Sequence, residues 1–513
     1  MPSTTNIDTV DSLALLSLKC ASRTFDLSSR LAHVSMRDQI VRAQLLARDL
    51  RSFDHDGRRV LVVGAGIAGT AFAIEAVAAH FEIVLLEAEA SALKLQSAVT
   101  TRYVGPFMYE WPSAFHDDQS YPPDPSRHLG DAPAHTPHWG EQKPVAASAM
   151  AGQYLDWLKA ARVALGPLGP SLWFDVDKAQ VKAFVRTFVV AASANFRRWM
   201  AGFPLLPMPP LGIMSGRADA DNPPGAPALA AFVPDYVVLA AGMGQETTAL
   251  PVGKGKSVPA SGRRFWQNDD LKKPLAADQE IGVFGGGDGA LQDVLRLLTQ
   301  FNHPLELIAH LREDATVAAL LDRERDALLA IEQQSRLIGT WTLGNAVFAG
   351  VDAACREVAE RLAAEPALRK QLAGGMRSGK GAVCHFVRKV HFSKAYLLNR
   401  FVVHLIASSR AAADALSEED GQGHVGYRLY FGAEPEASAA ATGGAASKRI
   451  EVTVNLPAGR LETFEFDDVV VRLQLEDQAV GASQMIQLSV RDNGLRTSIA
   501  QVPLPFVMSH SNP

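Results

Sequence analysis

Two glycine-rich segments are the residues of this sequence whose types and spacing indicate a chemistry. The first reads Gly64-Ala65-Gly66-Ile67-Ala68-Gly69 and lies between an apolar run at residues 60–63 and an Ala-rich segment of helical periodicity. Its first glycine permits a tight turn, the second lets a pyrophosphate approach the backbone, and the third lets helix and strand pack closely. Free N–H groups at the start of such a helix attract phosphate. We therefore predict dinucleotide contacts at Gly64, Gly66, Ile67, Ala68 and Gly69.

An acidic residue follows this segment at a spacing that suits a ribose. Glu87 ends a second apolar run at residues 83–86, eighteen positions past Gly69. A carboxylate there can accept hydrogen bonds from a ribose diol, as in FAD or NAD. A later apolar run at 236–239 leads into Ala241-Gly242, where small residues let the backbone pass close to a cofactor. We expect this run to be the last strand of the first domain, with Ala241 and Gly242 at the cofactor.

The second glycine-rich segment repeats the pattern after a strand predicted at Ile281–Phe284. It reads Gly285-Gly286-Gly287-Asp288-Gly289-Ala290, with Gly285, Gly287 and Ala290 at the three small positions. We expect Asp288 to cap the helix that follows, because a carboxylate complements the free N–H groups of a helix start. A hairpin predicted over residues 449–466 and a strand at 467–472 close this second unit much as the first one closes.

The ribose position of the second unit lacks an acid. We predict its next strand at residues 305–308, followed by Ala309-His310-Leu311-Arg312. With no carboxylate there to bind a free 2′-hydroxyl, His310 or Arg312 could meet a 2′-phosphate. This pattern favours NADPH over NADH as the ligand of the second unit.

Candidates for direct contact with a ligand lie in a loop rich in proline, glycine and aromatic residues. Arg102 could hold a phosphate or a substrate carboxylate, and Tyr109 could pack on a flat ring. The alternative is a packed aromatic loop whose arginine pairs with a surface carboxylate. On a later helix, Tyr396, Asn399 and Arg400 stand at one-turn spacing. We expect them to form a surface ridge rather than to face a crevice.

The histidines and cysteines predict no further site. His128, His135 and His138 lie in a segment rich in proline and aspartate without a pattern that would order metal ligands, so no metal is expected. None of the three cysteines belongs to a CxxC pair, which excludes the dithiol chemistry of disulfide reductases. We expect Cys384 to be buried.

Composition limits the class of protein. A chain of 513 residues with 47% apolar and 20% charged residues is globular and exceeds one ordinary core. The net charge is −5 without a Lys/Arg block, so no nucleic-acid partner is expected. No run approaches the ~20 apolar residues of a membrane span, so no membrane partner is expected. Few cysteines and the lack of a signal-peptide pattern predict a cytoplasmic protein.

The order of these features resembles the flavoprotein oxidoreductases with two dinucleotide-binding domains. That group includes the thioredoxin-reductase-like enzymes and the flavin monooxygenases. The resemblance implies FAD in the first domain, a nicotinamide dinucleotide in the second, and hydride transfer from nicotinamide to flavin. It implies an FAD-dependent, NAD(P)H-linked oxidoreductase, with a monooxygenase among the subclasses, that acts on an unidentified small molecule. The late Gly-Asp strand that covers the flavin in these relatives is not recognisable after residue 475.

We therefore predict an α/β fold with two tandem Rossmann-like dinucleotide-binding domains, an N-terminal helical extension and helical insertions. The expected boundaries are 1–57 for the extension, 58–270 for the FAD-binding domain, 271–480 for the NAD(P)-binding domain with its helical insertion, and 481–513 for the tail. Two alternatives stay open: a flavin oxidase whose second loop is only structural, and a sensor or scaffold that binds a dinucleotide without turnover. Neither a catalytic residue nor the oligomeric state is predicted.

Overall fold

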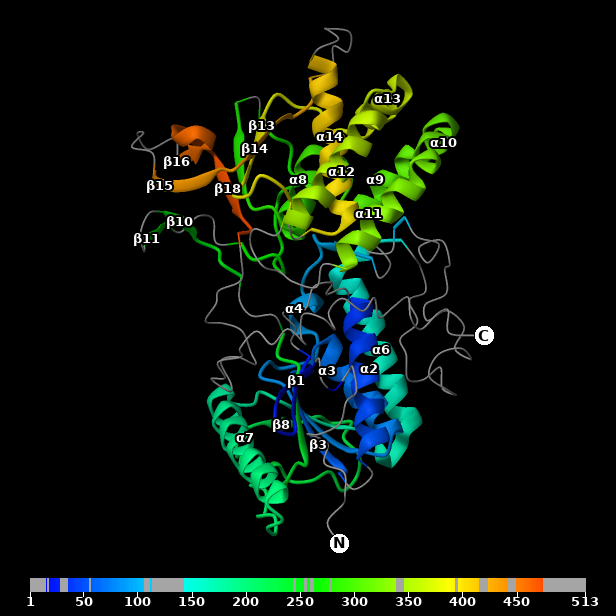
Figure 1. Ribbon diagram of the computed structural model, residues 1–513, viewed down its shortest axis with the longest axis vertical. Helices are drawn as coiled ribbons and strands as arrows, with labels where there is room; N and C mark the ends of the chain where they lie inside the picture. Colours follow the sequence, from blue (N-terminus) through cyan, green and yellow to red (C-terminus); the bar gives the residue numbers. More distant parts are fainter. Residues whose placement is uncertain are drawn as a thin grey trace.

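A computed structural model of the chain contains two α/β units, one above the other in Figure 1. The structure describes residues 15, 18–27, 36–54, 57–105, 111–112, 143–242, 246–252, 256–258, 263–276, 278–337, 346–392, 395–414, 423–440 and 449–473. Tyr109, the three histidines considered as metal ligands, and the tail at 481–513 lie outside these residues.

The first unit is built on a seven-stranded sheet with the order β1-β2-β9-β3-β4-β7-β8. Its strands are β1 (Lys19–Ala21), β2 (Thr24–Asp26), β3 (Arg59–Val63), β4 (Glu82–Leu86), β7 (Ser171–Phe174), β8 (Arg217–Ala218) and β9 (Tyr236–Leu239). The five inner strands are parallel, and β1 and β8 pair antiparallel at the two edges. Most residues of β3, β4 and β9 are buried, as expected of parallel strands covered on both faces.

Helices cover both faces of the first sheet. The core on one face includes α2 (Met36–Phe53), α3 (Ile67–Ala78) and α6 (Ala147–Leu165). The core on the other face includes α7 (Lys178–Met200), which stands alone on that side in Figure 1. The smaller elements are α4 (Lys94–Ser97), β5 (Tyr103–Val104), β6 (Val145–Ala146), η4 (Gly166–Leu168) and η5 (Leu229–Ala231). The N-terminal extension thus supplies the expected helix and also two strands, which were too short for their pattern to be recognised.

The second unit contains a four-stranded parallel sheet with the order β14-β13-β12-β18. These strands are β12 (Glu280–Phe284), β13 (Ala382–Val387), β14 (Gly426–Phe431) and β18 (Asp468–Val471). An antiparallel sheet of β15 (Glu434–Ala440), β16 (Ile450–Leu456) and β17 (Arg460–Phe466) packs against it through an aromatic core. The remaining small elements are β10 (Leu250–Val252), β11 (Lys256–Val258) and η6 (Pro457–Gly459). The predicted hairpin and the predicted final strand are confirmed.

A helical insertion separates the first two strands of the second unit. After α8 (Asp288–Leu298) come α9 (Pro304–Leu311), α10 (Ala315–Arg323), α11 (Arg325–Leu337), α12 (Ala346–Ala363) and α13 (Pro366–Gly375), and α14 (Leu397–Asp414) follows β13. The strand predicted at 305–308 is wrong, because these residues lie in α9. His303 caps that helix through a ring nitrogen 3.2 Å from the N–H nitrogen of Leu305, and Pro304 occupies its first turn.

The predicted fold class, an α/β fold with two tandem Rossmann-like units, is confirmed. In each unit a glycine-rich segment connects a parallel strand to a helix, between β3 and α3 and between β12 and α8. Among the described helices, none combines the length and the hydropathy that a membrane crossing requires.

Candidate functional site

The first glycine loop has the geometry that its sequence predicts. Gly64 has a φ of +107°, and a Cβ there would collide with the carbonyl oxygen of Ala240. A Cβ on Gly69 would collide with the carbonyl oxygen of Gly64. By contrast, a Cβ on Gly66 would meet no atom of the described part of the chain within 4 Å. Gly64 and Gly69 therefore permit close packing, whereas Gly66 borders open space that suits a phosphate.

The helix after this loop leaves its first N–H groups available. α3 begins at Ile67, and no side chain caps it at Gly66. Because the first four N–H groups of a helix have no partner within the helix, this helix start is suited to bind an anion. Ala68 lies in the same first turn. The predicted contacts of Ile67 and Ala68 with a dinucleotide agree with this position and stay predictions.

Glu87 lies at the mouth of the first loop. One carboxylate oxygen accepts a hydrogen bond from the N–H of Ala65 at 2.7 Å, and the other accepts one from Glu89 at 2.9 Å. These bonds orient the carboxylate beside the glycine loop. A carboxylate offers about four lone-pair positions, so Glu87 keeps acceptor capacity for a ribose diol.

The residues after β9 lie at the same edge of the first sheet. The N–H of Ala240 donates to the carbonyl of Val63 at 2.7 Å, which brings the chain beside Gly64. Ala241 and Gly242 follow and are exposed, and Gly242 has a φ of +80°. This places both residues at the carboxyl edge of β3 and β9, and their contact with a cofactor stays a prediction.

The second glycine loop repeats the first, position by position. Gly285 has a φ of +147°, and a Cβ there would collide with the carbonyl oxygen of Arg472. A Cβ on Gly287 would meet no atom within 4 Å, and Ala290 is fully buried. No side chain caps α8 at Gly287. The second loop therefore also presents one open glycine and one uncapped helix start.

Asp288 does not cap α8, contrary to the prediction. Its carboxylate accepts hydrogen bonds from the backbone N–H of Tyr396 at 2.9 Å and from the side-chain amide of Asn399 at 2.6 Å. Burial raises the pKa of Asp288 to about 6, although both hydrogen bonds act in the opposite direction. Asp288 therefore connects the second glycine loop to the start of α14. The corresponding residue of the first loop is Ile67, which has no carboxylate.

A histidine on β13 holds the second loop from the other side. Nε2 of His385 lies 2.7 Å from the carbonyl oxygen of Gly285, and Nδ1 lies 3.0 Å from the hydroxyl oxygen of Tyr427. Because a carbonyl oxygen only accepts, Nε2 carries the proton and Nδ1 accepts from Tyr427. Burial lowers the pKa of His385 to about 4, so the ring is neutral near pH 7. The sequence carries no signal for this contact, because it joins residues 100 positions apart.

The residues predicted to bind a 2′-phosphate lie elsewhere. Nε2 of His310 lies 2.9 Å from the carbonyl oxygen of Gln371, and Arg312 pairs with Asp322. Both belong to the helical insertion, whereas the strand that pairs with β12 is β13. The residues after β13 are Arg388 and Lys389, which hold the position that Glu87 holds after β4. The prediction concerned the residues after 305–308 and is wrong for them, because they lie in a helix. The absence of an acid directly after β13 is a separate finding.

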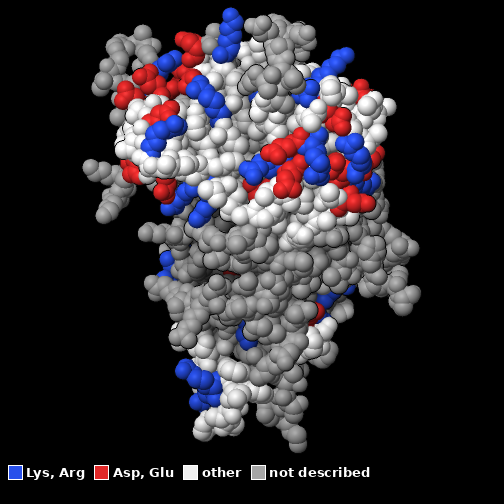
Figure 2. All heavy atoms as spheres, turned by 45° about the horizontal axis from the view of Figure 1, so that its top comes forward, with Lys and Arg blue, Asp and Glu red and all other residues white. Residues whose placement is uncertain are grey.

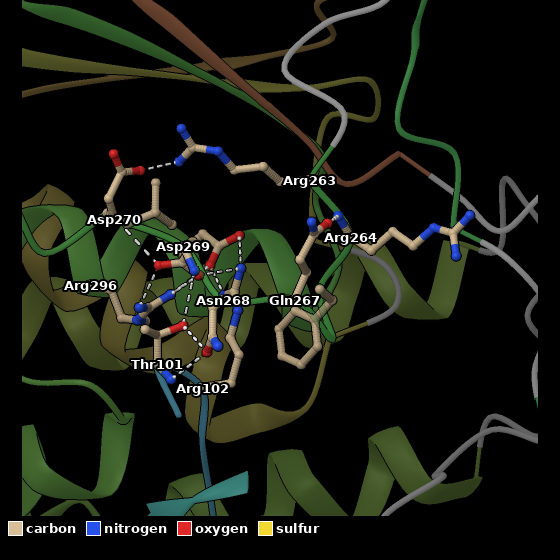
Figure 3. A network of polar contacts seen from close by, with 12 residues as sticks. Thr101, Arg102, Arg263, Arg264, Gln267, Asn268, Asp269, Asp270 and Arg296 are labelled. Carbon is tan, nitrogen blue, oxygen red and sulfur yellow. Dashed lines mark hydrogen bonds and ion pairs between the residues drawn. The ribbon is translucent and has the colours of Figure 1, made fainter. Parts of the chain in front are cut away.

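Arg102 lies in a buried charge network between the two units (Figure 3). It pairs with Asp269 of the connecting segment at 2.9 Å and with Asp293 of α8. Asp269 also accepts two hydrogen bonds from Arg296, at 2.8 and 2.9 Å, and Asp293 pairs with Arg472 at 3.0 Å. The side chains of all five residues are at most 5% exposed. The network therefore joins residues of both units through shared carboxylates.

This placement does not support the expected contact of Arg102 with a ligand. Its guanidinium also lies 4.5 Å from the centre of the Phe265 ring. Burial acts to lower the pKa of Arg102, but the attraction of Asp293 and Asp269 outweighs it, so the pKa is raised. The alternative of an arginine paired with a carboxylate fits better, although the pair is buried rather than on the surface.

The predicted surface ridge on α14 is wrong. Tyr396, Asn399 and Arg400 are all buried, because α14 packs against α12 and α8. Arg400 lies 3.5 Å from Asp352 of α12. The expectation for Cys384 is confirmed, since its side chain is fully buried. Within the described residues, no group of histidine, cysteine, aspartate and glutamate side chains could hold a metal ion.

No family model matches the sequence, and no curated protein matches it. Solved structures that resemble the fold include a bacillithiol disulfide reductase from Bacillus cereus, at 11% identity and a TM-score of 0.37, over 85% of this chain and 83% of that one. Others are a thioredoxin reductase of T. acidophilum (12% identity, TM-score 0.32, 84% and 80% covered) and one of Lactococcus lactis (11%, 0.32, 88% and 98%). Because these TM-scores lie below 0.5, the matches carry no argument about activity, and the function has to be inferred from the residues of this chain.

Proposed function

We propose that this chain is an FAD-dependent, NAD(P)H-linked oxidoreductase that acts on a small molecule. The observation that carries the proposal is the duplicated loop geometry. In both units a glycine with open space beside it precedes a helix that no side chain caps. Both loops follow parallel strands, where dinucleotides bind in folds of this class. Two such sites in one chain suit a pair of dinucleotides that exchange electrons.

The first unit suits FAD. Gly66 leaves room for the pyrophosphate, the N–H groups at the start of α3 would bind its oxygens, and Glu87 would accept hydrogen bonds from the ribose diol. A bound flavin would supply the redox chemistry. The protein would supply binding and orientation, which explains why sequence reasoning finds no acid, base or nucleophile.

The second unit suits a nicotinamide dinucleotide, and NADPH better than NADH. Gly287 leaves room for its pyrophosphate. At the end of β13, Arg388 and Lys389 stand where a carboxylate would select a 2′-hydroxyl. Arg388 forms an ion pair with Glu434 at 2.5 Å. Its side chain is 61% exposed, so it is accessible to a 2′-phosphate.

Two glycine substitutions with matched controls test the proposal. Gly66→Ala and Gly287→Ala each add a methyl group where no atom of the described residues lies within 4 Å, so both variants should fold. Gly152→Ala and Gly350→Ala add the same group in equally open positions on α6 and α12. Gly66→Ala should purify with less flavin, whereas Gly287→Ala should keep its flavin and be reduced more slowly by NADPH in anaerobic stopped-flow mixing. The controls should behave as the wild type.

Each departure from this result identifies another function. A colourless wild-type protein that releases no flavin on denaturation would refute the proposal. Flavin that neither NADH nor NADPH reduces would indicate an oxidase with a structural second loop. Tight dinucleotide binding without nicotinamide or oxygen consumption would indicate a sensor or scaffold. Consumption of NADPH and oxygen together with a hydroxylated product would place the enzyme among the monooxygenases.

A further inference from the structure

One long stretch of the first unit carries basic residues and no acidic ones. Between Asp177 and Asp219 the sequence contains no aspartate or glutamate, and it contains six basic residues: Lys178, Lys182, Arg186, Arg197, Arg198 and Arg217. The stretch includes α7, the helix that stands alone on its face of the first sheet (Figure 1). The two flanking acids are engaged, since Asp177 caps α7 and Asp219 pairs with Arg162. Glu89 and Asp175, which precede the stretch, pair with Lys178 and Arg217. The stretch itself is positive although the whole chain is negative, and Arg197 and Arg198 carry its charge at the end of α7.

Large apolar side chains are exposed where α7 ends. Met200 is 64% exposed, Phe203 60%, Leu205 51% and Leu206 52%. All four lie within seven residues of the end of α7 and the loop after it. Together with the two preceding arginines we call this segment the α7 tip (residues 197–206). Figure 2 shows a group of Lys and Arg among uncharged residues at the lower left of the molecule. The upper unit, by contrast, shows both charges intermixed.

The loop of the α7 tip is held in place by hydrogen bonds. The backbone of Leu206 exchanges two hydrogen bonds with the side chain of Asn195, both at 2.8 Å. Nε of Arg198 donates to the carbonyl of Pro204 at 2.6 Å, and its guanidinium lies 5.8 Å from the centre of the Phe203 ring. These hydrogen bonds hold the loop in a conformation that keeps its apolar side chains in contact with water. Exposure of several large apolar side chains together is typical of an interaction site.

The positive charge of the α7 tip favours some binding partners over others. A second copy docked tip to tip would bring the same arginines together, which costs free energy in a symmetric interface. A surface with negative charge and an apolar interior attracts arginines and accepts phenylalanine and leucine at once. An anionic lipid bilayer has both properties.

We propose that the α7 tip docks on the surface of an anionic lipid membrane. Phe203, Leu205 and Leu206 would enter the boundary between headgroups and acyl chains, and Arg197 would lie at the lipid phosphates. The sequence argument against a membrane partner concerned spanning segments, and a peripheral contact needs none. The proposal does not depend on the flavin function, because α7 begins just after the carboxyl end of β7, at the edge of the sheet where the first glycine loop lies, and the tip is at the other end of the helix.

Vesicle sedimentation with the full chain tests this docking. The wild type should bind vesicles of phosphatidylcholine with about 30% phosphatidylglycerol at least tenfold more strongly than pure phosphatidylcholine vesicles. Raising the salt from about 0.1 M to about 0.5 M should weaken the binding. The triple variant Phe203→Ser, Leu205→Ser, Leu206→Ser should lose it, and Arg197→Gln should reduce it about fivefold, the factor for one basic residue at an anionic surface.

A matched control keeps the test specific. Val163→Ser and Leu168→Ser, combined in one variant, replace side chains that are 74% and 68% exposed at the end of α6 and in η4, so they remove exposed apolar surface outside the α7 tip. This control should bind vesicles as the wild type does. Absence of binding by the wild type, or equal loss in the control, would overturn the proposal. A dimer that the triple variant dissociates, without vesicle binding by the wild type, would instead assign the tip to a second copy and would also overturn it.

Discussion

Replacing Asp293 by asparagine tests whether the buried charge network holds the two units together. The carboxylate is fully buried and pairs with Arg102, with Arg472 at 3.0 Å and with Arg296 at 3.5 Å. Burial acts to raise the pKa of Asp293, but the arginines outweigh it and keep the pKa below its usual range. Asparagine preserves the size of the side chain and removes the charge. The variant therefore leaves three buried arginines with one carboxylate fewer.

The expected loss follows from the contacts. At 3.0 Å and an effective dielectric constant of about 20, one such pair contributes about 5 kcal/mol of Coulomb attraction, much of which offsets the desolvation of the two charges. Removing one partner of a buried pair costs about 3–5 kcal/mol of unfolding free energy, because the remaining charge stays buried. Asp269 still pairs with Arg102 and Arg296, so Arg472 is the residue that loses most.

Asp270→Asn is the matched control for this measurement. Asp270 is the next residue after Asp269, is 42% exposed and pairs with Arg263 and Lys273, and an exposed pair contributes about 0.2–1 kcal/mol. Urea unfolding of both variants, followed by tryptophan fluorescence and by limited proteolysis of the connecting segment, compares the two. If Asp293→Asn loses no more stability than Asp270→Asn, the network does not join the units. Arg102→Gln should likewise lose stability while it keeps its cofactor, whereas loss of cofactor alone would restore the ligand contact that the sequence predicted.

Acidification should destabilise the protein, because burial lowers the pKa of His385 to about 4 and that of His303 to about 3. Between about pH 6.5 and pH 4 the unfolded chain binds these two protons and the folded chain does not, so each histidine lowers stability by about 1.4 kcal/mol per pH unit. Asp288, whose pKa burial raises to about 6, acts in the opposite direction below about pH 6, because it takes up a proton in the folded chain, and it offsets about one histidine. Urea midpoints at pH 7 and pH 5 measure the sum, and His385→Gln should remove the share of one histidine from the slope. Arg388→Gln should raise the KM for NADPH about tenfold and leave the KM for NADH unchanged, because one charge-assisted hydrogen bond to a 2′-phosphate is lost. Arg312→Gln is the control. An equal effect of both substitutions would refute the placement of the 2′-phosphate contact at the end of β13. Flavin content measured by absorbance should fall in Gly66→Ala alone among the first-unit variants, and full retention there would place the flavin elsewhere.

The glycine loops could be predicted because their physics is local. The conformation of Gly64, the open space at Gly66 and the close packing at Gly69 follow from residue type and a spacing of a few positions. Glu87 could be placed for the same reason, since one helix and one strand separate it from the loop. The repeat of this pattern at Gly285 made two Rossmann-like units the natural prediction.

The second strand of the second unit could not be found in this way. A short apolar run is compatible with a buried strand and with one face of a helix. The apolar run at residues 305–308 predicts a strand, but these residues form part of α9. In the sheet β12 lies between β18 and β13, and β13 begins at Ala382, after six helices of the described residues, α8 to α13. Sequence order suggests which strands pair only when the connection between them is short.

By itself, the sequence determined the two glycine-rich loops between strand and helix, their glycine geometry and the acid that accompanies the first. Only the tertiary structure decided what surrounds them. Arg102 and Asp293 stand 191 positions apart, His385 and Gly285 100 positions apart, and no periodicity links residues at such distances. These contacts form only when the sheets and helices pack. For this reason Arg102, expected at a ligand, belongs to a buried charge network, and His385, for which the sequence predicts no role, binds the second glycine loop.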